Sequence, residues 1–177
     1  MKRLTRVFLA GAALVMCANS AWAAEEGTVK ILAPWESGGH VYRIEPGKLL
    51  FQGQAKGIMY IESGEGALNA ALFVCPGRRE ISIADGKVEA SGQCIIDGAD
   101  GGTVFAKFSC SGVIGACDGR FTLTGGTGRF KGITGEGDMM VRTVIAQMAA
   151  NMESGAAISG AAGLVIWPNL SYKIPGN

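Results

Sequence analysis

Apolar and polar residues alternate along several short stretches of this chain. Residues 86–94 and 103–110 place apolar or small side chains at even positions, and residues 120–124 place them at odd positions. Period-two alternation of this kind predicts half-buried β-strands. Glycine and Asp-Gly steps recur between these stretches and predict turns, as all-β domains show. The pattern therefore indicates an all-β domain.

One β-hairpin can be placed in register from the sequence. Asp85-Gly86 is a favoured two-residue turn, and it would pair Ile83 with Val88 and Ile81 with Ala90. This register puts the apolar residues of both strands on one face of the sheet.

Four cysteines follow residue 23: Cys75, Cys94, Cys110 and Cys117. An even number in an exported chain implies two disulfides. A four-cysteine zinc site is the rival, but the gaps of 19, 16 and 7 residues contain no close C-x-x-C pair. We therefore expect disulfides and no metal.

Strand faces favour one pairing of the cysteines. In the hairpin register, Cys75 and Cys94 share a face, but an unbroken ladder would place Cys75 opposite Ile96, two positions past Cys94. A disulfide between the two cysteines therefore needs an irregularity in the ladder. A turn at residues 113–114 would set Cys110 directly opposite Cys117. The alternative Cys94–Cys110 pair, if its hairpin turned at Gly101-Gly102, would put the two sulfurs on opposite faces. We expect Cys75–Cys94 and Cys110–Cys117.

The first 23 residues have the layout of a cleaved secretory signal. Three basic residues precede an apolar run at 7–16, and alanines flank Trp22 before the expected cut. The run is too short for a helix across a bilayer core of about 30 Å. Cys17 offers a lipoprotein alternative, which is disfavoured because Met16 is bulkier than the residue expected before a lipidated cysteine. We expect an exported protein, periplasmic or secreted.

Residues 24–177 are expected to form a single domain with a core of its own. Removing the basic leader changes the formal net charge from +1 to −2, which argues against nucleic acid as a partner. No apolar run in this part is long enough for a transmembrane helix. We expect irregular chain over 24–47, a strand end or short helix over 144–152, and a closing strand within 156–167.

A glycine-rich stretch, residues 117–137, is the densest motif. Lys131 invites a phosphate-loop interpretation, but the spacing matches neither the Walker loop nor the dinucleotide fingerprint. A strand, a tight glycine turn and a second strand explain the motif better. The residues of this signature turn are Gly125, Gly126, Thr127, Gly128, Phe130, Gly132 and Gly135.

This stretch resembles the G-G-T-G-x-F-x-G-x-x-G motif of the allene oxide cyclase and dirigent barrel superfamily. It is also similar to small exported bacterial proteins that carry a GGTGRFKGITG-type signature. The resemblance covers roughly residues 72–142 and is specific across 117–137. It implies an antiparallel barrel of about eight strands with an apolar interior, often trimeric in the plant members. Ile133-Thr134 stands where dirigent sequences usually carry alanine, and no catalytic acid of those families has a match here.

Few residues are candidates for chemistry. His40 is the only histidine and has no nucleophile motif beside it. The loop 97–102 lacks the alternating oxygen ligands of an EF-hand, which favours a polar turn over a calcium site. Glu62 and Arg142 are the candidates for charged groups inside the barrel. We expect no catalytic residue, metal or cofactor.

Two functions fit these observations. One is a non-catalytic exported protein that binds a small apolar ligand in the barrel or interacts with partners at the cell envelope. The alternative is an isomerase or cyclase that orients an apolar substrate inside the barrel. A charged residue inside the barrel would favour the enzyme. A cavity without one would favour binding, and a filled barrel would favour an interaction role.

Overall fold

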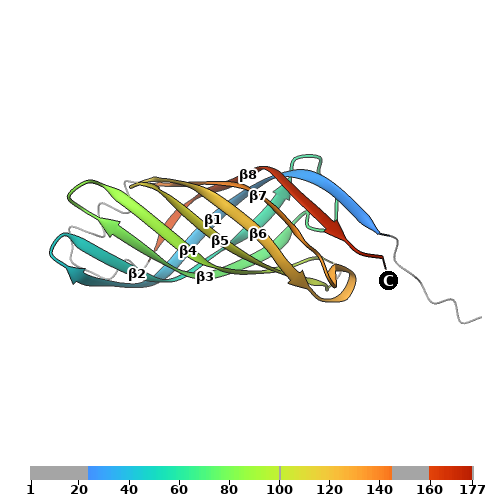
Figure 1. Cartoon of the computed structure of the whole chain (residues 1–177), viewed down its shortest axis with the longest axis horizontal. Helices are drawn as coiled ribbons and strands as arrows, with labels where there is room; N and C mark the ends of the chain where they lie inside the picture. The colour runs from blue at the N-terminus through green and yellow to red at the C-terminus, as the bar shows by residue number, and fades with distance from the viewer. Residues whose placement is uncertain (1–23, 100, 145–159, 177) are drawn as a thin grey trace, which may run out of the picture.

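The computed structural model describes residues 24–99, 101–144 and 160–176, which form a closed antiparallel barrel (Figure 1). Each strand pairs with the next along the chain, and the last pairs with the first. The elements are β1 (Glu25–Glu45), β2 (Lys48–Ile61), β3 (Ala71–Ser82), β4 (Lys87–Asp97), β5 (Thr103–Val113), β6 (Ala116–Gly126), the 3-10 helix η1 (Gly128–Phe130), β7 (Gly135–Thr143) and β8 (Ala161–Ile174). The predicted all-β barrel of eight strands is confirmed.

The segment expected to be irregular, residues 24–47, instead forms the long strand β1, so that prediction was wrong. Ile31, Ala33 and Trp35 are buried, and exposed residues stand between them. Pro34 and the Gly38-Gly39 step hide this alternation in the sequence. The closing strand is present as β8, while residues 1–23, most of the 144–152 segment and the start of the 156–167 segment lie outside the described residues.

The β3–β4 hairpin is built in a different register from the predicted one. Ile81 pairs with Val88, so the connection is a four-residue loop rather than the two-residue turn at Asp85-Gly86. The shift of two residues preserves the buried face. It also sets Cys75 directly opposite Cys94, with no irregularity between them.

Both expected disulfides are present. Cys75 and Cys94 have a Cα–Cα distance of 4.0 Å across the β3–β4 ladder. Cys110 and Cys117 are diagonal rather than opposite, with a Cα–Cα distance of 5.6 Å, because the β5–β6 turn is at Ile114-Gly115. Disulfides are typical of proteins outside the reducing cytoplasm.

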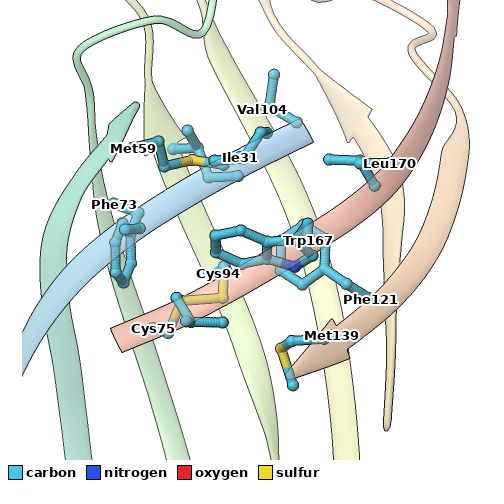
Figure 2. Packing of buried hydrophobic residues seen from close by; sticks show 14 of the residues in the cluster. Ile31, Met59, Phe73, Cys75, Cys94, Val104, Phe121, Met139, Trp167 and Leu170 are labelled. Atoms are coloured by element: carbon cyan, nitrogen blue, oxygen red, sulfur yellow. A yellow bond between two sulfur atoms is a disulfide. The ribbon is translucent and has the colours of Figure 1, made fainter. Parts of the chain in front are cut away.

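One half of the barrel is filled by packed side chains. At mid-height the Trp167 ring lies edge-on to Phe73 and Phe121, with centroid distances of 6.5 and 5.0 Å. Figure 2 shows these rings beside the Cys75–Cys94 disulfide. Beyond them, buried aliphatic residues fill the interior toward the end that carries the β6–β7 connection.

The signature turn closes that end of the barrel. Its chain leaves β6, forms η1 and returns in β7, and Phe130 is only 1% exposed. The Phe130 ring fills this end of the barrel, and we call it the Phe130 plug. A Cβ on Gly102 would lie 2.8 Å from the ring, so glycine at 102 leaves the space that the ring occupies. Gly128 and Gly132 have positive φ, which side chains disfavour. The glycine motif is therefore structural.

Candidate ligand cavity

The other half of the barrel contains a cavity of about 90 Å³. It extends from the Trp167 ring toward the end that carries the β1–β2 and β3–β4 turns. Aromatic side chains from six strands form much of its wall: Trp35, Phe51, Phe73, Phe108, Phe121 and Trp167. Apolar walls of this kind are typical of sites for small molecules.

Small inward residues on β2 to β4 leave this half unfilled. Gly53, Ala55, Gly77 and Ala90 all line the cavity. Where a Cβ on Gly77 would project, the Phe108 ring is 3.3 Å away, so the ring packs over the glycine backbone. A larger residue at Ala55 or Ala90 would occupy the space that the cavity now holds, whereas a Cβ on Gly53 or Gly77 would clash with the backbone oxygen of Gly38 or Ser91.

Arg79 is a charged group inside the barrel that was not among the candidates predicted from the sequence. It stands on the inward face of β3 with Cys75 and Ile81, is partly buried, and lines the cavity. Among the described residues no carboxylate or other acceptor pairs with its guanidinium. Burial therefore lowers the pKa of Arg79 without a compensating charge.

Its neighbour Arg78 has the opposite environment. Alternation along the strand points Arg78 outward, where its side chain is 62% exposed and lies 3.6 Å from the Glu80 carboxylate. The two adjacent arginines therefore differ in face and in pairing.

Two residues of the cavity wall carry further buried donors. The indole nitrogens of Trp35 and Trp167 are buried, and within the described chain neither has a hydrogen-bond partner. A buried donor without a partner costs about 1–3 kcal/mol. Tryptophan N–H groups usually find an acceptor when buried. Two tryptophans of the cavity wall therefore each keep a buried donor unpaired within the described chain.

The described wall of the cavity contains no aspartate, glutamate, histidine, lysine or tyrosine. Ser37 supplies a hydroxyl, but no base stands beside it in that set. General acid–base catalysis needs a group that gains and loses a proton near the working pH. The cavity can thus bind and orient a molecule, but these residues offer no proton relay.

The two predicted interior charges lie outside the barrel wall, so that hypothesis was wrong for both. Glu62 follows the last residue of β2 and forms an ion pair with Lys30 at 2.7 Å, with 67% of its side chain exposed. Arg142 is on the outward face of β7 and pairs with Asp118 at 2.5 Å. Neither residue lines the cavity.

The remaining candidates stand apart from the cavity. His40 is exposed on β1, with its ring 6.4 Å from that of Tyr42. At the calcium-like loop, the Asp97 carboxylate accepts a hydrogen bond of 2.9 Å from the Thr103 hydroxyl. Over the described part of the chain, no cluster of histidine, cysteine and acidic residues has the geometry to hold a metal ion.

None of the described residues belongs to a helix long and apolar enough to cross a membrane. Comparison of the chain with known families, curated proteins and solved structures found no match. The resemblance to the allene oxide cyclase and dirigent superfamily stays a prediction.

Proposed function

We propose that this protein is exported and binds a small, largely apolar molecule inside the barrel. The cavity is the observation that carries the proposal, because the same interior is packed solid on the other side of the Trp167 ring. Export is supported by the signal-like pattern of residues 1–23 and by the two disulfides.

The size of the cavity limits the ligand. An apolar protein cavity of about 150 Å³ accommodates benzene. At about 90 Å³ the cavity here holds a smaller group, or a ring once the side chains adjust around it. The ligand body is therefore a single ring or a short aliphatic chain.

An isomerase or cyclase is the less supported alternative. Arg79 is an interior charge of the kind that such an enzyme would use to stabilise a developing negative charge. Arg79 meets the criterion of a charge inside the barrel, but the same wall lacks a group that could move a proton, so only an enzyme that orients its substrate without acid–base catalysis fits the cavity. Binding needs only what the cavity already has.

Native mass spectrometry of the unreduced protein, purified from the exporting compartment, is the first test. We expect a mass that reflects loss of the leader and two disulfides, together with a retained small molecule. Binding of toluene, measured by ligand-observed NMR, then tests the cavity itself.

A space-filling variant makes that second measurement decisive. Ala90 lines the cavity, so Ala90→Leu should abolish toluene binding. Gln93→Leu, at an exposed position of the same strand, is the matched control and should bind toluene as the wild type does. Equal binding by wild type and Ala90→Leu would exclude the cavity as the site.

One surface feature favours self-association as a second role. An apolar stripe crosses the outside of β1 to β5, with Leu32 beside Tyr60, Ile58 beside Leu72, and further residues on β4 and β5. Exposed apolar patches commonly mark interaction sites. Tyr60→Lys should lower the native mass to that of a monomer, whereas Ile83→Lys, in the β3–β4 loop, should not.

A further inference from the structure

We propose that the ligand of this cavity is an organic acid whose acid group pairs with Arg79. The inference rests on the proposed binding function and adds the chemical class of the ligand. The apolar body would lie among the aromatic rings, and the acid group would lie nearer the turns at the end of the barrel.

The charge inside the barrel is the first support. Arg79 faces the cavity, and within the described chain no acid neutralises it. A guanidinium in an apolar site is stabilised by a partner that brings both negative charge and acceptor oxygens. A neutral hydrocarbon would bury the same charge further without compensation.

The set of hydrogen-bonding groups points the same way. Besides Arg79, two residues of the cavity wall, Trp35 and Trp167, have buried indole N–H groups without a partner in the described chain. The Arg79 guanidinium has no acceptor within the described chain, and a ligand with oxygens supplies one. A ligand rich in donors, such as an amine, would meet a cation and would be repelled.

The position of Arg79 along β3 orients the ligand. The inward residues of this strand run from Phe73 in the packed middle, through Cys75 and Gly77, to Arg79 and then Ile81. Phe51 and Ala90 flank Arg79 on the neighbouring strands. The Arg79 charge therefore lies toward the turn end of the cavity, and the Trp167 ring bounds the apolar part at the other end. This arrangement suits a ligand with one acid end and one apolar end.

Benzoate and benzamide test this inference, because they have nearly the same size and differ in charge. Isothermal titration calorimetry at neutral pH would compare both probes on four unreduced proteins: wild type, Arg79→Gln, Arg79→Lys and Arg78→Gln. Arg78 also borders the cavity, but its side chain is 62% exposed and lies 3.6 Å from the Glu80 carboxylate, so Arg78→Gln is the matched control. Circular dichroism and a thermal melt confirm that each variant is folded.

We expect wild type to bind benzoate about tenfold to a hundredfold more tightly than benzamide, the range for a hydrogen bond to a charged group. Arg79→Gln should lose this preference and still bind benzamide. Arg79→Lys should retain part of the preference, and Arg78→Gln should retain all of it.

Other results separate this inference from the proposed function. Equal affinity for benzoate and benzamide, or a preference that survives in Arg79→Gln, would overturn the acid assignment and leave apolar binding intact. Inorganic phosphate binding as tightly as benzoate would show a simple anion site and would also overturn it. Failure of benzoate, benzamide and toluene alike would contradict the binding function itself.

Discussion

Arg79 on β3 is paired with Ala90 on β4, and both side chains face the cavity inside the barrel. The alanine leaves the space into which the arginine projects. A charge that is partly buried without a partner lowers stability, and proteins retain such groups mainly where they serve a function. The pair thus links the shape of the cavity to its charge.

Replacing Arg79 with methionine should stabilise the ligand-free protein. Methionine keeps an unbranched stem that packs in the interior, and it removes the unpaired charge. We expect a gain of about 1 kcal/mol, or about 2–4 °C in Tm. Thermal and urea unfolding would measure it, with the exposed Arg78→Met as the control that changes little. A clear loss of stability in Arg79→Met would mean that the charge is compensated in the folded protein.

Removing the Cys75–Cys94 disulfide should cost more stability than removing Cys110–Cys117. The first closes a loop with a sequence separation of 19 residues and the second one of 7. Loop-closure entropy then predicts losses of about 3 and about 2 kcal/mol for the two double alanine variants. Urea unfolding of the variants gives the comparison. The reverse order would show that packing of the sulfurs, rather than loop length, dominates.

The Phe130 plug should contribute strongly to stability. Its ring is almost fully buried at the end opposite the cavity, against Gly102. Phe130→Ala is expected to cost about 3–5 kcal/mol, as for other buried phenylalanines. Phe105→Ala, at a ring that is 40% exposed on β5, is the control and should cost less than about 1 kcal/mol. Similar losses for the two variants would refute a structural role for the signature turn.

Alternation along the chain was sufficient to predict an all-β domain and both disulfides, because faces depend only on odd and even positions. The closed barrel of about eight strands was expected from the resemblance and not from the alternation. Registers were less predictable, since they depend on the number of residues in each turn. At the β3–β4 hairpin the loop contains four residues and not two, so every cross-strand pair moved by two positions while the faces stayed the same.

The interior charge was missed for a related reason. Arg78, Arg79 and Glu80 form a run of three charged residues, which is typical of the solvent-exposed end of a strand. Such a run gives no sign that its middle residue points inward. The parity of Cys75 and Ile81 places Arg79 on the buried face, and that signal was present in the sequence. Glu62 and Arg142 were chosen without a parity argument, and each is explained by an ion pair on the outside.

Tyr172 should make stability depend on pH in the alkaline range. Burial, and then its hydrogen bond of 2.8 Å to Glu25, raise its pKa above the ordinary 10.0. The folded state therefore holds this proton more tightly, so its contribution is complete below pH 10 and is lost as the pH rises through the folded pKa. Urea midpoints between about pH 8 and 11 should fall less steeply for Tyr172→Phe than for wild type, while Tyr42→Phe, at an exposed ring, should follow the wild type. An unchanged slope in Tyr172→Phe would show that other groups cause the alkaline loss.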